Sequence, residues 1–424
     1  MHSTPSDSDS LSRAVIEAAT APFIRTRVPR HARWLFALLD RLVIGSLELT
    51  MPDGATRVFG PGGAPAHGAS VMPARLAFHD WDVAAEVLKG GDVTFGETYM
   101  EGRWTTPDLT QVLTLIAANQ TALERLFYGR FWTRWLMRLN HLLRANTRRG
   151  AKRNIVAHYD LGNDFYRLWL DPTMSYSAAL FDGDYSLSTE AAQKAKYERI
   201  LGELDVSAAS RVLEIGCGWG GFVECAAQAG CEVTGISLSD AQTRYAQQRI
   251  EAAGLSRRVA LRIQDYREIA GAFDAIASIE MVEAVGERWW PTYFQTLART
   301  LAIGGRACLQ AITIKDERFE RYRTQSDFIQ QYIFPGGMLP SRSRLIEVAR
   351  DAGFELVRGH AFGRDYLETV KRWLAAFDAH GADVRALGFD ETFIRGWRFY
   401  LALCAAGFDT ETTDVAQYTF VRDR

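Results

Sequence analysis

The 424-residue chain lacks several features that would assign it to a specialised class of protein. No apolar run reaches the roughly 18 residues of a membrane span, so we expect a cytoplasmic protein that is soluble or lies on the inner face of a membrane. The five cysteines form no C-x-x-C pair, which predicts neither a zinc site nor a disulfide framework, and no metal is expected. A net charge of −2 argues against general nucleic-acid binding.

Acidic residues are also missing from one segment of the chain. Between Leu126 and Tyr159 there is no Asp or Glu, whereas Arg, Lys and aromatic side chains are frequent. Trp132 and Trp135 recur with leucines at helical spacing, so residues 121–153 are predicted to form a basic amphipathic linker helix. Such a helix suits an anionic membrane surface, or an interdomain contact in which its apolar stripe packs on protein.

The rest of the sequence divides into three parts. Residues 1–10 are rich in Ser and Asp and are expected to form a disordered tail. Residues 11–120 are expected to form a small N-terminal α+β accessory domain. Residues 154–424 alternate expected strands and helices, which is typical of an α/β fold with a doubly wound, Rossmann-like sheet. The strands expected in that sheet are 211–215, 231–236, 259–263, 273–280, 305–312, 353–361 and 416–422.

The most informative motif is the sequence RVLEIGCGWGG at residues 211–221. An apolar strand runs into Gly216, Gly218, Gly220 and Gly221, and a helical pattern follows at once. Glycine lets the backbone approach a ligand closely, and the first turn of a helix offers unpaired N–H groups. We therefore expect a nucleotide-like ligand here, with glycines used only for helix–sheet packing as the alternative.

The kind of nucleotide depends on one missing and one present carboxylate. A dinucleotide-binding sheet usually carries Asp or Glu at the end of its second strand, where it binds the ribose hydroxyls. Here that strand runs into the segment Ser237–Gln242, and the strand end itself has no acid. Glu214, by contrast, lies inside the first strand and can reach the crevice beyond the sheet edge. This layout favours S-adenosylmethionine (SAM) over NAD.

Taken in order, several segments resemble the cyclopropane-fatty-acyl-phospholipid synthases, a SAM-dependent family related to the mycolic-acid methyltransferases. These segments are His158–Asn163, Tyr176-Ser177, the glycine loop, Ser237–Gln242, Gln264–Tyr266, Tyr332–Gly337 and Tyr400–Cys404. The matches run from residue 154 to the end of the chain. Residues 95–102 are similar to the accessory domain of the longer members. The resemblance implies a homodimeric enzyme that modifies unsaturated acyl chains of membrane phospholipids at an anionic membrane surface.

The resemblance and the glycine motif together give a set of expected SAM-binding residues. These are Tyr176, Ser177, Glu214, Gly216, Gly218, Gly220, Ser237, Ser239, Gln242, Asp265 and Tyr266. Tyr266 would face the adenine, or would alternatively only pack at its strand end. An aromatic ring elsewhere could face the sulfonium by cation–π attraction.

In this family the double bond takes the methyl group of SAM, and a bound bicarbonate then removes a proton so that a cyclopropane ring closes. Cys, Glu, His and Tyr side chains and the backbone hold the bicarbonate. Here Glu283 and Tyr366 match, but the cysteine position is Ala178 and the histidine position is Gln310. Because Gln can still donate a hydrogen bond to an anion, bicarbonate stays a candidate. Glu280 is an additional carboxylate that could itself be the base, or could cap the next helix.

Cys404 matches a cysteine of the family that is often named as catalytic. Alkene methylation does not obviously require a thiol, because the alkene is the nucleophile and the methyl carbon is the electrophile. A place in the wall of the substrate channel is therefore the alternative. The catalytic candidates are Glu283, Tyr366, Cys404, Gln310 and Glu280.

The leading hypothesis is conversion of a cis double bond in a phospholipid acyl chain into a cyclopropane. Since Ala178 and Gln310 depart from the pattern, a methyltransferase that leaves a methyl or methylene branch is the main alternative. A small-amine methyltransferase is a second alternative, because this kind of sheet serves many acceptors. A lipid-binding protein without chemistry is the third.

Overall fold

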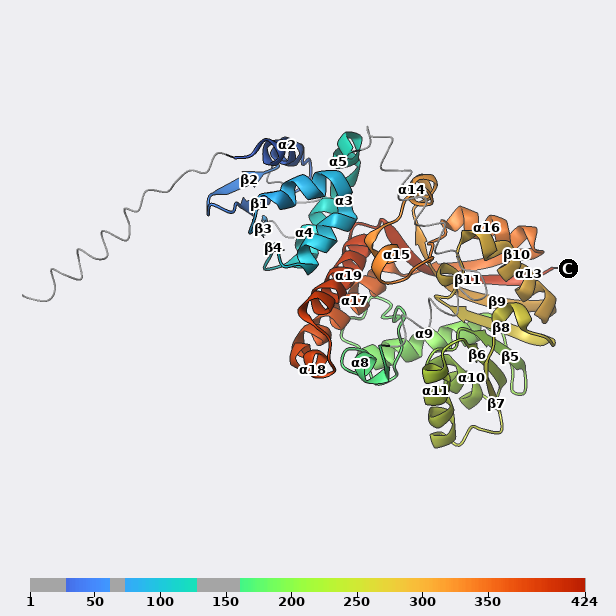
Figure 1. Cartoon of the computed structure of the whole chain (residues 1–424). Helices are drawn as coiled ribbons and strands as arrows, with labels where there is room; N and C mark the ends of the chain where they lie inside the picture. The colour runs from blue at the N-terminus through green and yellow to red at the C-terminus, as the bar shows by residue number, and fades with distance from the viewer. Residues whose placement is uncertain (1–27, 62–72, 128–160, 424) are drawn as a thin grey trace, which may run out of the picture.

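The computed structural model describes residues 28–61, 73–127 and 161–423, which contain a four-stranded and a seven-stranded sheet (Figure 1). The expected tail at 1–10 lies outside the described residues, and so does most of the expected basic helix at 121–153. Those two expectations therefore stay predictions.

The smaller sheet lies in the predicted accessory domain and has the strand order β2-β1-β3-β4. β1 (Leu47–Thr50) and β2 (Thr56–Phe59) form an antiparallel hairpin, and Gly54 in the turn between them has a φ of 80°. β3 (Ala74–Phe78) pairs parallel with β1 and antiparallel with the short β4 (Trp104–Thr105). The helices of this domain are α2 (Arg30–Leu39), α3 (Asp82–Met100), α4 (Leu109–Ala118) and α5 (Gln120–Phe127).

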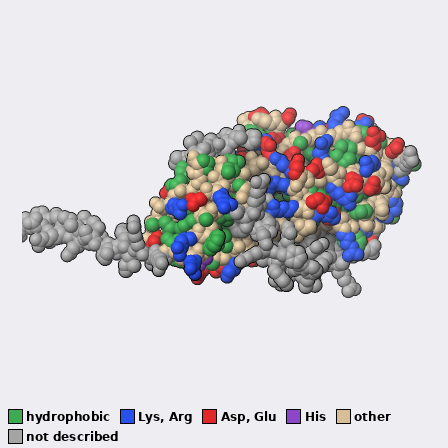
Figure 2. All heavy atoms as spheres, turned by 90° about the horizontal axis from the view of Figure 1, so that it is seen from above, with side chains coloured by type: hydrophobic (Ala, Val, Ile, Leu, Met, Phe, Trp, Pro, Cys, Tyr) green, Lys and Arg blue, Asp and Glu red, His purple; other side chains and the backbone are tan. Residues whose placement is uncertain are grey.

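The surface of this domain mixes apolar and charged side chains. Figure 2 shows hydrophobic side chains interspersed with Lys, Arg, Asp and Glu on the lobe at the left. Large apolar side chains that are exposed in the accessory domain include Trp34, of which 73% is accessible, and also Val43 and Val58.

Helix α3 connects the parts predicted to be the accessory and the catalytic domain. It continues past a break at Gly91, whose φ of 68° is not helical and is tolerated because glycine has no Cβ. Beyond the break, a Cβ on Gly96 would lie only 2.5 Å from the ring of Phe328, so glycine permits the close contact there. Phe95 meets the ring of Phe399 edge-on at 6.3 Å. One hydrophobic core therefore extends from the accessory domain into the catalytic domain.

The larger sheet has the strand order β10-β11-β9-β8-β5-β6-β7. The strands from β9 to β7 are parallel, whereas β11 is antiparallel to both of its neighbours. This order confirms the predicted α/β sheet, and the predicted strand boundaries hold to within a few residues. The strands are β5 (Arg211–Ile215), β6 (Glu232–Ser237), β7 (Val259–Ile263), β8 (Phe273–Ile279), β9 (Leu301–Ile314), β10 (Phe354–Ala361) and β11 (Thr413–Arg422).

Helices cover both faces of the larger sheet. Val212 of β5 packs into one core with α9, α10 and α11, and the adjacent Leu213 packs into the opposite core with α13 and α16. α17 and α19 lie between this sheet and the accessory domain (Figure 1). The helix bounds are α8 (Asn163–Arg167), α9 (Thr189–Leu204), α10 (Gly221–Gln228), α11 (Asp240–Ala252), α12 (Val282–Val285), α13 (Trp290–Thr300), α14 (Asp316–Tyr322), α15 (Phe328–Tyr332), α16 (Arg342–Asp351), α17 (Gly363–Ala379), α18 (Gly381–Ala386) and α19 (Glu391–Asp409).

The strand order reverses between β5 and β8. From β5 the chain moves outward through β6 to β7, and it then returns to β8 on the other side of β5. In sheets of this kind ligands bind beyond the carboxyl ends of the strands at such a reversal. The glycine loop follows β5 and Glu280 follows β8, so both lie at this point.

Candidate active site

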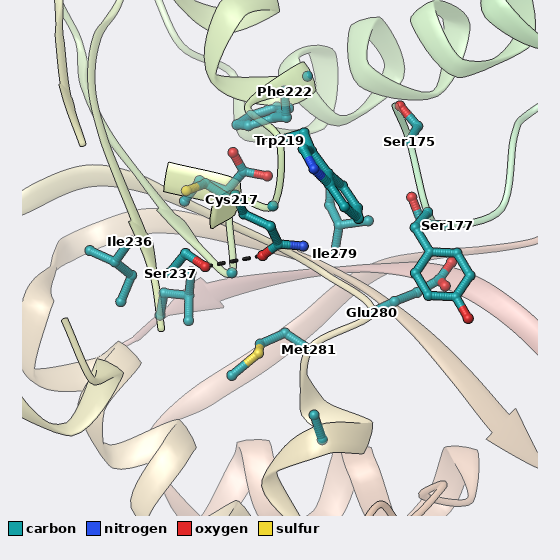
Figure 3. Close-up of a pocket in the computed structure, with 18 of the residues that line it drawn as sticks. Ser175, Ser177, Cys217, Trp219, Phe222, Ile236, Ser237, Ile279, Glu280 and Met281 are labelled. Atoms are coloured by element: carbon teal, nitrogen blue, oxygen red, sulfur yellow. Dashed lines mark hydrogen bonds between the residues drawn. The ribbon is translucent and has the colours of Figure 1, made fainter. Parts of the chain in front are cut away.

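A pocket lies at the carboxyl ends of β5, β6 and β8, and we call it the donor pocket (Figure 3). The glycine loop forms one wall, with Trp219 opposite Met281 across the space. Most of the expected SAM-binding residues line it, namely Tyr176, Ser177, Glu214, Gly216, Gly218, Ser237, Gln242 and Tyr266.

The glycines of the loop serve both packing and the pocket. Gly216, Gly218 and Gly220 all have positive φ, at 83°, 48° and 85°. A Cβ on Gly220 would lie 3.0 Å from the Cβ of Ala246, so this glycine lets the loop pack on α11. A Cβ on Gly218, by contrast, would have no atom within 4 Å. The loop thus leaves open space at Gly218, as close approach of a ligand requires.

Glu214 fits the methionine end of SAM. Its side chain is buried, and its Oε2 atom has no hydrogen-bond partner among the described residues. Burial raises the pKa of this carboxyl to about 8. A buried polar atom of this kind calls for a partner, and an ammonium group such as that of SAM would supply one.

Three expected SAM-binding residues do not line the donor pocket. Gly220 packs on α11, as described above. Ser239 caps α11, because its Oγ accepts from the backbone N–H of Gln242 at 3.3 Å. Asp265 caps the short helix that follows it and forms an ion pair of 2.5 Å with Arg267. Gln242 itself accepts a hydrogen bond of 3.2 Å from Ser237 inside the pocket (Figure 3).

The sequence reasoning missed Lys196 altogether. This lysine of α9 is fully buried, and its Nζ lies 2.6 Å from the Oγ of Ser177. Burial lowers the pKa of its ammonium group to about 8. A lysine within a helix otherwise predicts an exposed side chain, so no sequence signal pointed to it. Met281 was also missed, although it adjoins Glu280, which was named.

A second cavity, of about 880 Å³, lies between the catalytic and accessory domains, and we call it the apolar cavity. Its walls are mainly aliphatic and aromatic. The accessory domain contributes side chains such as Leu35 and Leu113, and α17 and α19 contribute others such as Trp373 and Leu403. Tyr176, Glu280 and Ala284 line both this cavity and the donor pocket. The two spaces therefore meet at these residues, which we call the junction.

Glu280 is the centre of a hydrogen-bonded cluster at the junction. Its Oε1 atom accepts from the backbone N–H of Ala178 at 2.9 Å and from the side-chain amide of Gln310 at 2.8 Å. Its Oε2 atom accepts from the hydroxyl of Tyr366 at 2.6 Å. The alternative role as a helix cap is not seen, because Met281 is the N-cap of α12 and no side chain caps that helix.

The other two catalytic candidates also line the apolar cavity. Glu283 accepts from the backbone N–H of Ile312 at 2.5 Å, and burial together with the charge of Glu280 raises the pKa of Glu283 to about 8. Both effects favour the protonated form of Glu283. Burial also raises the pKa of the Cys404 thiol, which favours a neutral thiol lining the cavity over an activated nucleophile.

Neither a metal site nor a membrane-spanning helix is found in the described part of the chain. Within residues 28–61, 73–127 and 161–423, no three His, Cys, Asp or Glu side chains are grouped as a metal ion would need. Over the same residues, no helix is both long and apolar enough to cross a membrane.

Known structures and sequences place this site in a class. The crystal structure of mycolic acid cyclopropane synthase CmaA1, complexed with SAH and CTAB, covers 64% of this chain and 98% of its own, with a TM-score of 0.60 and 31% identity. The protein is thus a SAM-dependent methyltransferase. The mycolic acid cyclopropane synthetase family matches residues 146–418, and the chain belongs to that family.

Two curated relatives extend over most of the chain. The tuberculostearic acid methyltransferase UfaA1 of Mycobacterium tuberculosis is 38% identical over 80% of this chain and 81% of its own length. The cyclopropane-fatty-acyl-phospholipid synthase of Escherichia coli is 32% identical over 88% of this chain and 96% of its own length. Both alignments are longer than residues 154–424, so the similarity extends into the part of the chain before residue 154.

Proposed function

We propose that the protein transfers the methyl carbon of SAM to a cis double bond in an acyl chain of a membrane phospholipid, and that a cyclopropane ring then closes. The observation that carries this proposal is the meeting of the donor pocket with the apolar cavity at Tyr176, Glu280 and Ala284. An acyl chain in the apolar cavity would bring its double bond to the place where the methyl group leaves the donor pocket.

The size and lining of the apolar cavity favour a long apolar acceptor over a small amine. Ligand pockets usually measure about 300 to 1,000 Å³, and a volume of about 880 Å³ is near the upper end of that range. A small amine would leave most of this space empty. Apolar walls also keep water from the positive charge that methylation places on carbon, and water would otherwise quench it.

The accessory domain favours a membrane-bound acceptor. Trp34 of α2 is largely exposed, the exposed Arg30 lies one turn before it on the same helix, and the interior of the domain forms one wall of the apolar cavity. Tryptophan next to basic residues suits the interface of an anionic membrane. Co-sedimentation with anionic vesicles, compared with neutral ones, tests this part of the proposal. Light scattering of the full chain tests the homodimer that the family resemblance implies.

Relatedness to a tuberculostearic acid methyltransferase supports a second candidate, a branched product. Atom balance separates the two candidates. Adding a methyl cation to an alkene and removing a proton adds CH2, whether the product is a ring or a methylene branch. A saturated methyl branch requires two further hydrogens and hence a reductant.

The deciding experiment is lipid analysis after expression in cells rich in unsaturated phospholipids. A gain of CH2 with loss of the double bond, shown by resistance to ozonolysis, supports the cyclopropane. A gain of CH2 with the double bond kept indicates a methylene branch. No change in acyl mass, with folded protein and SAM present, would contradict both candidates.

A further inference from the structure

We propose that the carboxylate of Glu280 is the base that takes the proton from the newly added methyl group, so that the chain supplies its own anion and needs no bicarbonate. This inference rests on the proposed function. It assigns the proton-removing step to one side chain at the junction of the two cavities.

The first argument is that Glu280 occupies an anion site completely. Its two carboxylate oxygens accept three hydrogen bonds, from Ala178, Gln310 and Tyr366. These donors come from three separate parts of the catalytic domain: the segment before α9, β9 and α17. A small anion placed here would need the same donors, and Glu280 already uses them.

The second argument is the backbone of Glu280. Its φ of 51° lies in the left-handed region, which favours glycine and is uncommon for a glutamate. Its N–H donates to the carbonyl oxygen of Gln310 at 2.7 Å, so both the main chain and the side chain of Glu280 are fixed to that residue. Backbone strain of this kind is concentrated at functional sites, where the surrounding structure holds it in place.

The third argument is position. Glu280 lines both cavities, whereas Glu283 lines only the apolar cavity. Figure 3 shows Glu280 on the side of the donor pocket near Ser177, well away from Ser237. The methyl carbon passes from SAM in the donor pocket to the acyl chain in the apolar cavity. The base that removes a proton from this carbon must therefore lie at the junction. Glu280 meets that condition and Glu283 does not.

The step balances without a further reagent. The π electrons of the double bond form a C–C bond to the methyl carbon as the C–S bond breaks, and the C–S pair stays on sulfur. The second alkene carbon is left positive. Glu280 takes a proton from the new methyl group, and the freed C–H pair forms the second C–C bond of the ring. The carboxylic acid then loses its proton to water before the next turnover. No oxidant or reductant is needed.

The first test compares the full-length wild type with and without bicarbonate. SAM and vesicles of an unsaturated anionic phospholipid are supplied in buffer freed of carbon dioxide, and S-adenosylhomocysteine and cyclopropane lipid are measured. We expect the rate to change less than about twofold when bicarbonate is added back. A rate that collapses without bicarbonate and returns with it would overturn the inference and leave the proposed function standing.

The second test uses two variants of the same residue. Glu280→Gln keeps the shape but cannot accept a proton, so we expect turnover to fall by about 10²- to 10⁴-fold, the usual contribution of a general base. Glu280→Gly removes the side chain and suits the positive φ. It frees the donors of Ala178, Gln310 and Tyr366, so added bicarbonate or formate should raise its rate at least about tenfold. Glu280→Gln should not respond.

A matched control separates chemistry from backbone strain. Glu411 has a φ of 53°, close to that of Glu280, but it lies at the surface in an ion pair with Arg364. Glu411→Gln and Glu411→Gly should leave turnover and the bicarbonate response unchanged. SAM affinity, measured by calorimetry, should stay within about threefold in Glu280→Gln, which keeps the shape of the side chain in the wall of the donor pocket.

Two further results would count against the inference. Activity of Glu280→Gln above about half that of the wild type would exclude Glu280 as the base. A wild type that binds SAM but consumes none with unsaturated vesicles would overturn the proposed function, and the inference would fall with it.

Discussion

The phenol oxygens of Tyr176 and Tyr400 lie 2.7 Å apart, although the two residues are separated by 224 positions in the sequence. Tyr176 lines both cavities, and Tyr400 reaches the apolar cavity from α19. The ring of Tyr176 also lies 5.4 Å from those of Trp169 and Trp373. The hydrogen bond and these rings hold Tyr176 in a fixed orientation at the junction.

Tyr400→Phe removes that hydrogen bond without changing the ring. We expect turnover to fall about three- to tenfold, because one hydrogen bond contributes about 1 kcal/mol to holding Tyr176 in place. SAM affinity should fall less than turnover, since Tyr400 does not itself line the donor pocket and Tyr176 keeps its contacts with Trp169 and Trp373. Steady-state kinetics and calorimetry measure the two quantities. Tyr185→Phe, at a half-exposed tyrosine that lines neither cavity, is the control and should behave as wild type.

Glu283→Gln should lower turnover more than SAM affinity. Glu283 lines the apolar cavity but not the donor pocket, so its contribution begins after SAM is bound. We expect a fall in kcat of at least about tenfold with a dissociation constant for SAM within about threefold of wild type. An equal loss of SAM binding would show that this residue acts in the donor pocket instead.

The same variant should show a pH-dependent gain in stability. Burial raises the pKa of Glu283 from 4.5 in the unfolded chain to about 8 in the folded protein. Between these two values the folded state binds a proton that the unfolded state has lost, so the stability of the wild type falls as the pH rises. Glutamine does not titrate. The free energy of unfolding of Glu283→Gln relative to wild type should therefore increase between pH 5 and pH 8, by about 1 to 3 kcal/mol. Urea unfolding without ligand measures it, and a gain that shrinks with pH would contradict the assignment.

Cys404 is predicted to be a wall residue and not a nucleophile. Its side chain is partly buried and lines the apolar cavity, and desolvation there raises the pKa of the thiol. Cys404→Ala should keep turnover within about fivefold of wild type. Cys404→Phe should reduce turnover on long acyl chains far more, because it fills the space. Complete loss in Cys404→Ala, with the protein folded by circular dichroism, would restore a chemical role for the thiol.

The accessory domain should influence which acyl chains react. Leu113→Trp adds bulk to the wall that α4 contributes to the apolar cavity. We expect activity on long chains to fall at least about tenfold and activity on shorter chains to fall less, measured with lipids of graded length. Val58→Trp, at an exposed position of the same domain, is the control for a general effect of tryptophan. Equal losses on all chain lengths would argue against a chain in this cavity.

Local patterns were sufficient to predict much of the fold and most of the donor pocket. The glycine loop, Glu214 and Ser237 all lie where strand, turn and helix signals put them, because a parallel sheet brings its strand ends to one edge. Ser239 and Asp265 show the limit of this reasoning. Both cap helices and do not line the pocket, so their SAM-binding roles stay predictions, because residues that cap helices and residues that bind ligands are of the same polar types.

Contacts between residues far apart in the chain could not be predicted from the sequence. The departures at Ala178 and Gln310 were recognised, but their meeting at the carboxylate of Glu280 depends on contacts across 102 and 30 residues. The apolar cavity forms where α19 packs against α3 and α4, nearly 300 residues earlier in the chain. No local periodicity in the sequence predicts a cavity that forms between such distant segments.

The meeting of the two cavities at only three shared lining residues has a consequence for inhibitor design. A single molecule could carry an adenosine group for the donor pocket and an alkyl tail for the apolar cavity, joined at the junction by a protonated amine in place of the sulfonium. The carboxylate of Glu280 would then face a permanent partner of opposite charge. Such a compound would discriminate between this enzyme and other methyltransferases by its tail, since the adenosine end is common to them all.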